Sequence, residues 1–224
     1  MPHEVPRRVP AEFTKDSPIT EIGLYQAKLT GMGLKQQGIS IQHVYCSPAL
    51  RCVQTADAIL DGLQADHTVT LKLENGLYEW LAWCHGEMPK FMSVEDLYLF
   101  GMRVDKHYKP KVQLGEMNMK ETSSEFYKRM YNITRILLKE SAKGNVMFVG
   151  HAASLEAATR QLVGHKPRPA QEFVKIVQKV PYCGLSMAQE TTGGGWELAD
   201  PPIPPLTHGP NVRFDWRILN GVKD

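Results

Sequence analysis

The sequence has few cysteines and lacks any long apolar run. Its four cysteines, Cys46, Cys52, Cys84 and Cys183, are scattered and do not have the paired spacing of zinc ligands, so we expect free thiols rather than a disulfide framework. No segment reaches the length of a membrane span, and residues 1–10 contain no apolar stretch typical of a signal peptide. We therefore predict a cytoplasmic protein that does not contact membranes.

Clustered positive charge is also missing. The formal net charge is +2, and lysines and arginines form no block of the kind that binds nucleic acid, so we expect no nucleic-acid partner. Apart from His151, the histidines lack metal-ligand spacing and are expected to be structural or solvated: His3, His43, His67, His85, His107, His165 and His208. We expect neither a metal site nor a cofactor.

The composition is that of a globular protein with enough apolar material for a core. Of the 224 residues, 42% are hydrophobic and 22% are charged, which favours a single α/β domain over residues 1–224. Helical periodicity predicts helices near 20–34, 48–63, 93–100, 122–143, 153–162 and 170–177, and strands are predicted near 41–46, 69–73, 145–149, 184–188 and 196–198. This alternation predicts a mostly parallel sheet with helices on both faces.

Three segments lie outside this alternation. Proline-rich residues 1–17 are expected to form an extended lead-in, because proline fixes φ and removes a backbone donor. Residues 84–120 contain prolines and several methionines, and we interpret them as a cap or insertion over one end of the sheet. Residues 201–224 are expected to form an extended tail.

Two local predictions concern how the helices begin and pack. In the first helix, Ile22, Tyr25, Leu29 and Met32 recur at spacings of three and four, which predicts that they line its buried face. Before the second helix, Ser47 is expected to be the N-cap residue, followed by a proline at the first helical position.

His151 is the first candidate for chemistry. The four apolar residues Val146–Val149 predict a buried strand, Gly150 permits a tight bend, and helix-forming residues follow. His151 should therefore lie where a strand ends and a helix begins, which is where open α/β sheets bind ligands and where a helix N-terminus favours an anion. The alternative is an ordinary polar residue at a strand end.

Arg51 is the second candidate. It lies in the opening turns of the helix that follows the strand near 41–46, so it also follows a strand end. Because parallel strands end at the same edge of a sheet, we expect Arg51 and His151 to meet in one cleft. A guanidinium group offers a fork of donors to phosphate oxygens, and a histidine near neutral pH can donate to the same group.

Glu79 is the third candidate. It is flanked by Tyr78, Trp80 and Trp83, and partial desolvation by these rings would raise its pKa toward the range useful for a general acid. The alternative is a glutamate in a surface loop whose aromatic neighbours merely pack.

Four stretches taken together show a family resemblance. They contain Cys46-Ser47-Pro48-Ala49-Leu50-Arg51, then Gly76-Leu77-Tyr78-Glu79-Trp80, then Gly150-His151-Ala152-Ala153-Ser154, and finally the proline-rich residues 200–210. In this order they resemble the histidine phosphatase (phosphoglycerate-mutase-like) superfamily, in particular its suppressors of T-cell receptor signalling and its insect ecdysteroid-phosphate phosphatases. The resemblance runs from near Met1 to about Trp216.

The resemblance implies a fold, a reaction and residue roles. The fold is the phosphoglycerate-mutase-like α/β fold, and the reaction proceeds through a covalent phosphohistidine without metal or cofactor. Arg51 is implied to bind phosphate, His151 to be the second histidine, which binds and stabilises the transferring phosphoryl group, and Glu79 to protonate the leaving oxygen.

One part of the family pattern is missing from these 224 residues. The family nucleophile lies in an Arg-His-Gly motif after the first strand, and this sequence contains no Arg-His-Gly. His3 is followed by Glu4 within the lead-in and is not assigned the role. We therefore expect a sheet without that first strand and severely reduced or absent turnover. The sequence is either a shortened form or incomplete version of an active enzyme, which we favour, or a product that keeps only a weak phosphate pocket.

Two function classes remain open. The first is a phosphomonoester hydrolase acting on a phosphorylated small molecule or phosphoprotein, with a steroid phosphate or a phosphotyrosine as substrate because the loop around Glu79 is aromatic. The second is a non-catalytic domain that binds phosphorylated partners or pairs with a second chain, for instance as a homodimer. A mutase is disfavoured, since the aromatic loop does not suit so small and polar a substrate.

Overall fold

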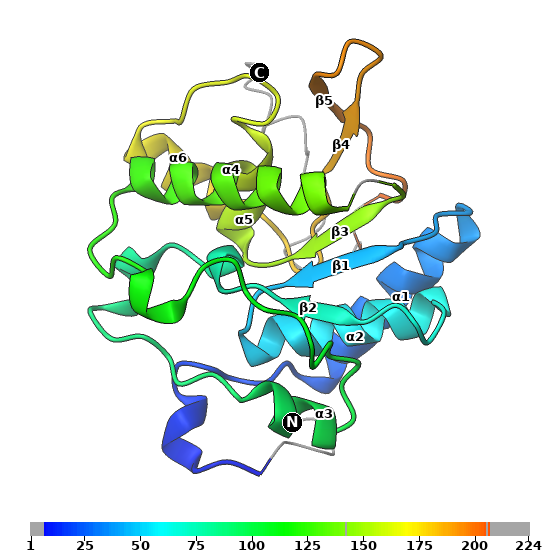
Figure 1. The fold of residues 1–224 in the computed structure, drawn as a ribbon, viewed down its shortest axis with the longest axis vertical. Coiled ribbons are helices and arrows are strands. Elements are labelled where there is room, and N and C mark those ends of the chain that lie inside the picture. The colour runs from blue at the N-terminus through cyan, green and yellow to red at the C-terminus, as the bar shows by residue number, and fades with distance from the viewer. Residues whose placement is uncertain (1–6, 142, 205, 207–224) are drawn as a thin grey trace.

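A three-stranded parallel sheet lies at the centre of the fold (Figure 1). The computed structural model describes residues 7–141, 143–204 and 206. In spatial order the strands are β2 (Leu71–Leu73), β1 (His43–Cys46) and β3 (Val146–Val149), with Tyr45 paired to Phe148 on one side and to Lys72 on the other. All three strands point in the same direction, so their carboxyl ends share one edge of the sheet.

Helices cover both faces of this sheet, which confirms the predicted fold class (Figure 1). One face carries α1 (Glu21–Gln36) and α2 (Leu50–Leu63), and the other carries α4 (Ser123–Glu140), α5 (Ala152–Thr159) and α6 (Ala170–Val177). Each layer has its own hydrophobic core, one built around α2 and the other around Phe126 and Phe173. No helix in the described ranges is long and apolar enough to cross a membrane.

The prediction for the buried face of α1 was wrong. Ile22 and Tyr25 are 60% and 64% exposed and Met32 is 43% exposed, whereas Ala27, Thr30, Gly31 and Leu34 are buried. The reason is a close backbone contact with α2: a Cβ added at Gly31 would lie 2.0 Å from the Ile59 carbonyl oxygen, and one at Gly62 of α2 would lie 2.0 Å from that of Lys28. Because the two backbones lie so close together, small residues of α1 face α2, and the larger apolar residues of the predicted face point away from it.

The predicted N-cap of α2 was also wrong. The helix begins at Leu50, and its N-cap residue, Ala49, contributes no side-chain hydrogen bond. Instead, the backbone N–H of Leu50 donates to the carboxylate of Asp16 over 2.7 Å, and Arg8 donates to the same carboxylate over 2.8 Å. A residue of the lead-in thus performs the capping role, and Ser47 is left for another contact.

The lead-in and the cap are more structured than predicted. Residues 10–13 form a short 3-10 helix rather than an extended segment, and residues 1–6 lie outside the described ranges. Within the predicted cap over residues 84–120, the short helix near 93–100 is present as α3 (Val94–Leu99). The fully buried carboxylate of Glu74 attaches residues 108–112 of this cap to the end of β2, because it accepts hydrogen bonds from Tyr108 Oη and from the backbone N–H groups of Lys111 and Val112.

The last two strands form a separate antiparallel hairpin. β4 (Met187–Glu190) pairs with β5 (Trp196–Ala199), and neither strand bonds to the parallel sheet in the described part of the chain. The strand predicted near 184–188 begins at Met187 instead, and residues 184–186 before it form an irregular connection. Helix α4 begins after a capping box formed by Thr122 and Glu125. Of the predicted tail, only residues 201–204 and 206 are described.

Candidate active site

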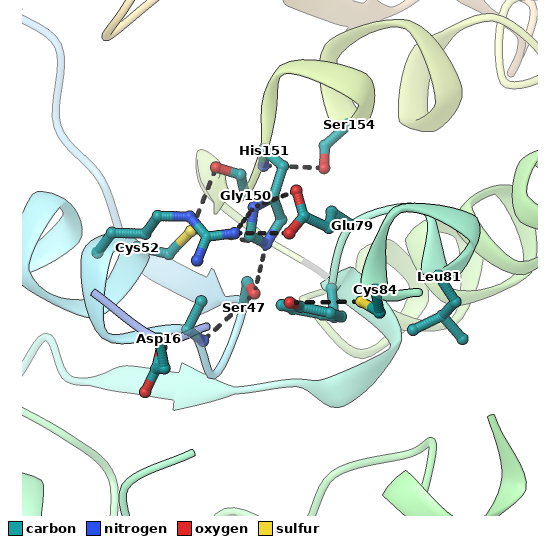
Figure 2. Close-up of polar contacts among 12 residues, drawn as sticks. Asp16, Ser47, Cys52, Glu79, Leu81, Cys84, Gly150, His151 and Ser154 are labelled. Carbon is teal, nitrogen blue, oxygen red and sulfur yellow. Dashed lines mark hydrogen bonds and ion pairs between the residues drawn. The ribbon is translucent and has the colours of Figure 1, made fainter. Parts of the chain in front are cut away.

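Arg51, Glu79 and His151 lie in direct contact at the carboxyl edge of the sheet. Figure 2 labels Glu79 and His151 and shows them close together. Arg51 Nη2 is 2.8 Å from Glu79 Oε1 and 2.9 Å from His151 Nδ1, and Glu79 Oε2 is 3.6 Å from His151 Nδ1. Arg51 extends from the first turn of α2, Glu79 from the loop after β2, and His151 directly precedes α5. The structure thus brings together three residues that are up to 100 positions apart.

The contact with Arg51 determines the tautomer of His151. A guanidinium group can only donate, so His151 Nδ1 accepts from Arg51 and the neutral ring carries its proton on Nε2. Nε2 lies 2.9 Å from Ser47 Oγ, which therefore accepts a hydrogen bond from the imidazole. In this state Ser47 is not activated as a nucleophile, because the imidazole has no free lone pair directed at it.

Burial keeps His151 neutral. The side chain is 5% exposed, and desolvation together with the charges of Arg51 and Arg129 holds its pKa well below the ordinary histidine value. Helix α5 fixes the backbone of His151, because the backbone N–H of His151 donates to Ser154 Oγ. Glu79 is an acidic neighbour of the imidazole in this structure. A bound dianion would add further negative charge there and would favour the protonated form of His151.

Cys52 is a second neighbour of His151 that the sequence analysis did not single out. Its Sγ atom lies 3.8 Å from His151 Nε2 and donates to the carbonyl oxygen of Gly150 over 3.3 Å. Burial raises the pKa of the thiol to about 12. Cys52 therefore stays protonated near neutral pH and is not a reactive thiolate.

Arg129 of α4 stabilises the loop that carries Glu79. The guanidinium of Arg129 donates to the backbone carbonyl oxygens of Gly76, Tyr78 and Glu79, over 2.7–3.1 Å, and pairs with Glu121. The stretches that contain Arg51, Glu79 and His151 were recognisable in the sequence, but Arg129 was not. Arg129 lies one position before a core residue in an amphipathic helix, and no local pattern distinguished it from a surface arginine.

The aromatic residues near Glu79 pack differently from one another. The Tyr78 ring is buried and meets the His151 ring edge to face, with centroids 5.1 Å apart, whereas Trp80 packs against Trp83 and Phe173. The Glu79 side chain is 23% exposed and is directed at Arg51 rather than into an apolar cage. Its immediate environment is thus set by a guanidinium group, which the sequence analysis had not paired with it.

None of the other described histidines lies at this site. His43 is at the opposite end of β1 and contacts the carbonyl oxygen of Lys143, and His67, His85, His107 and His165 are exposed. His3 and His208 lie outside the described ranges. The described residues also contain no group of three or more His, Cys, Asp or Glu side chains arranged to hold a metal ion.

Comparison with known proteins places these residues in a family context. A family model described as Histidine phosphatase superfamily (branch 1) matches residues 6–200. Among curated proteins, the human ubiquitin-associated and SH3 domain-containing protein B is 41% identical over 97% of this chain, and the Drosophila melanogaster ecdysteroid-phosphate phosphatase is 38% identical over 99%. The match covers 34% and 30% of those two proteins, so the chain spans about a third of their length.

A solved structure shows the same fold. The ecdysone phosphate phosphatase of Bombyx mori in complex with tungstate is 37% identical to this chain and superimposes with a TM-score of 0.83. The match covers 98% of this chain and 86% of that one. Part of the silkworm structure therefore has no counterpart in these 224 residues.

Proposed function

The chain belongs to the histidine phosphatase superfamily, and we propose that Arg51, Glu79 and His151 form the phosphate-binding and proton-donating part of a phosphomonoester hydrolase site. The observation that carries this proposal is the contact of one guanidinium group with both an imidazole and a carboxylate at the carboxyl edge of the sheet. A phosphoryl group needs positively charged donors, and its leaving oxygen needs a proton.

The Glu79 carboxylate holds Arg51 in the position in which it would bind a phosphate oxygen. The Nη2 atom of Arg51 is now bonded to the Glu79 carboxylate, and a negatively charged phosphate oxygen can replace that carboxylate as the hydrogen-bond acceptor. His151 then donates from Nε2, and the backbone N–H groups that begin α5 lie beside it. Phosphate binding thereby releases Glu79 from its ion pair.

Glu79 then serves as the proton donor to the leaving oxygen. Once Arg51 binds phosphate, the carboxyl group loses its cationic partner and lies next to the phosphoryl group. Its side chain is 23% exposed, so it is in contact with solvent. Arg129 keeps it in place, because it binds the backbone carbonyl oxygen of the same residue.

The leaving group is proposed to be a bulky apolar alcohol, of the steroid or tyrosine type. A cavity of about 380 Å³ is lined by Pro48, which follows Ser47 in the sequence, and by apolar side chains of the cap that include Phe91, Met92, Val94 and Leu114. Arg51, Glu79 and His151 do not line it. Its chemistry agrees with the names of the insect relatives, which refer to ecdysteroid phosphates. A phosphoprotein would have to place its side chain in the same space.

The 224-residue chain is proposed to bind phosphate but to turn over slowly. Among the described residues, the thiol and hydroxyl groups that contact a ring nitrogen of His151 are a protonated thiol at Cys52 and a hydroxyl at Ser47 that accepts, rather than donates, its hydrogen bond. Loss of a nucleophile costs several powers of ten in rate. The alternative function, a non-catalytic domain that binds phosphorylated partners, is favoured by this same observation.

Tungstate and phosphate binding test the proposal directly. We expect Arg51→Ala to weaken binding of either anion about 100-fold, because a charge-assisted contact is lost, and Arg103→Ala, which removes an arginine paired with Asp57 away from the site, to leave it unchanged. Glu79→Gln should strengthen binding, since it removes the competing carboxylate. Equal binding by the wild type and Arg51→Ala would rule out the proposed site.

Turnover separates the two functions. With p-nitrophenyl phosphate, residual hydrolysis that disappears in both His151→Ala and Glu79→Gln supports the enzyme. Anion binding that depends on Arg51 without any hydrolysis supports the binding domain. Hydrolysis at an ordinary enzyme rate would contradict the expectation of slow turnover.

A further inference from the structure

The cavity of about 380 Å³ lies between the end of β2 and residues 89–114 of the cap. Leu73 lines it from the sheet, and Phe91 and Met92 line it from the cap. Sites for small molecules have this size and are mainly apolar, and a few polar groups in them fix the orientation of the ligand. The polar groups of this cavity therefore indicate what it can hold.

The side-chain donors of the cavity lining are already bonded to protein acceptors. Tyr108 Oη donates to the buried carboxylate of Glu74 over 2.8 Å, and Ser93 Oγ donates to Asp96 over 2.6 Å. The ammonium group of Lys90 is paired with a carboxylate of the lead-in, and its side chain is 79% exposed. Three further lining residues have no backbone N–H because they are prolines: Pro48, Pro89 and Pro110.

Two oxygen atoms of the lining residues, by contrast, have no donor. Asn75 is only 9% exposed, and its amide nitrogen donates to the carbonyl oxygen of Val112 over 2.9 Å, which leaves Oδ1. Asp105 Oδ1 accepts from the backbone N–H groups of His107 and Tyr108, which leaves Oδ2. Within the described ranges neither remaining oxygen accepts a hydrogen bond, and neither is sealed inside the protein. Both can therefore accept from a ligand.

The cavity consequently favours hydrogen-bond donors and disfavours anions. A phosphate group needs donors, whereas here it would meet a carboxylate and an amide oxygen. Phosphate belongs instead at Arg51, which does not line the cavity. The chain connects the two places directly, because Pro48 lines the cavity and the preceding Ser47 is bonded to His151.

We propose that Asn75 and Asp105 determine the specificity of the site by selecting a leaving group that carries a free hydroxyl group. This inference rests on the proposed function, since it concerns the alcohol from which phosphate is removed. The substrate class is an apolar ring compound with one phosphorylated and at least one free hydroxyl. The free hydroxyl donates to Asp105 Oδ2 or Asn75 Oδ1, and the ring packs against the apolar lining. A tyrosine side chain is disfavoured, because its ring has no second hydroxyl.

The expected discrimination follows from the cost of an acceptor that loses water and gains no donor. A ligand without a free hydroxyl would displace water from the two oxygens and leave them unpaired. Sites that are built to bond a hydroxyl reject analogues that lack it far more strongly than apolar pockets reject a missing methylene. We therefore expect a difference in Kd of at least about tenfold.

Naphthalene probes test this selection. The compound 6-hydroxy-2-naphthyl phosphate has a free hydroxyl, 6-methoxy-2-naphthyl phosphate has an acceptor in its place, and 2-naphthyl phosphate has neither. Calorimetry with the full 224-residue chain should show the hydroxyl probe binding at least about tenfold more tightly than the other two. Equal affinities of the three probes would overturn the inference.

A conservative variant locates the selection at Asp105. Asp105→Asn keeps an oxygen for the backbone N–H groups and can place an amide donor where Oδ2 was, so the preference for hydroxyl over methoxy should fall at least about tenfold. Asp66→Asn is the matched control: Asp66 Oδ1 also accepts from a backbone N–H two residues on, but Asp66 does not line the cavity. Its preference should match that of the wild type.

The two variants are compared by a ratio of affinities measured on one protein, which a partial loss of folded chain does not change. Circular dichroism checks the fold. Equal preferences of Asp105→Asn and Asp66→Asn would overturn the role of Asp105. Should Asp105→Asn fail to fold, the three probes on the wild type still decide the inference.

Unphosphorylated probes separate this inference from the proposed function. The wild type should bind 2,6-dihydroxynaphthalene at least about tenfold more tightly than 2,6-dimethoxynaphthalene. If the two bind equally while phosphate binding depends on Arg51, the inference fails and the proposed anion site stands. If binding of the diol depends on Asp105 while phosphate binding is independent of Arg51, the selectivity of the cavity stands and the proposed hydrolase fails. A hydroxynaphthyl phosphate that binds no more tightly than the diol would overturn the assignment of the cavity to the leaving group.

Discussion

The two sides of β3 differ in how completely they are built. On the side of β1, backbone hydrogen bonds run from Asn145 to Val149, and at its carboxyl end the Arg51–Glu79–His151 cluster is closely bonded. On the side of β4, the same strand faces a groove of about 620 Å³. We call the β1 side the closed half; it comprises β2, β1, the inner edge of β3, α1, α2 and the site. We call the groove side of β3 the open side.

The largest effect is expected from breaking the support of the site in the closed half. Arg129→Met leaves the Glu121 carboxylate, which is 4% exposed, without its cation and removes three bonds to the Glu79 loop. We expect a loss of about 4 kcal/mol in unfolding free energy, since an unpaired buried charge remains. Urea unfolding measures it, and Arg135→Met on the exposed side of the same helix is the control. Similar losses for both variants would show that Arg129 has no special role.

The helix contact beneath the sheet gives the next largest effect. Gly62→Ala puts a Cβ atom 2.0 Å from the Lys28 carbonyl oxygen, so α1 and α2 must move apart, and we expect a cost of about 3 kcal/mol. Gly115→Ala, at a glycine with nothing within 4 Å, should be close to neutral. Thermal unfolding of the pair compares them. A neutral Gly62→Ala would mean that the closed half is more loosely packed than its backbone contacts indicate.

The protonation of His151 gives a smaller effect, which depends on pH. Because burial and Arg51 hold its pKa in the folded state below the ordinary value, only the unfolded chain takes up a proton as pH falls below about 6.5. Stability is therefore highest above that pH and should fall by up to about 1.4 kcal/mol per pH unit below it. His151→Gln should flatten this slope between about pH 6.5 and 5. An unchanged slope in that variant would indicate that another group titrates.

The smallest effect is expected on the open side. Phe148 lines the groove and is only partly buried, so Phe148→Ala should cost about 1 kcal/mol, well below the roughly 4 kcal/mol expected at the fully buried Phe126. Chemical unfolding of both variants tests this. Equal costs for the two variants would mean that the two sides of β3 are equally packed.

The sequence analysis named the three candidate residues that the structure brings into contact, but not the residues that support them. Arg51 and His151 were recognisable because each follows an apolar strand, and Glu79 because of its aromatic neighbours. Asp16, Ser47 and Arg129 were missed or misassigned: the first caps a helix 34 positions away, the second bonds the imidazole instead of capping, and the third reaches the loop 50 positions back. Such contacts join segments whose proximity no local pattern encodes.

Periodicity and residue type by themselves determined the α/β class, most helix positions and the edge of the sheet where the candidate residues lie, because these depend on local hydrogen bonding and on alternating burial. The tertiary structure decided which face of α1 is buried, how Arg51 sets the tautomer of His151, and that β4 and β5 stand apart from the parallel sheet. These outcomes depend on distances between segments that are far apart in the chain, and packing sets such distances only once all the segments are in place.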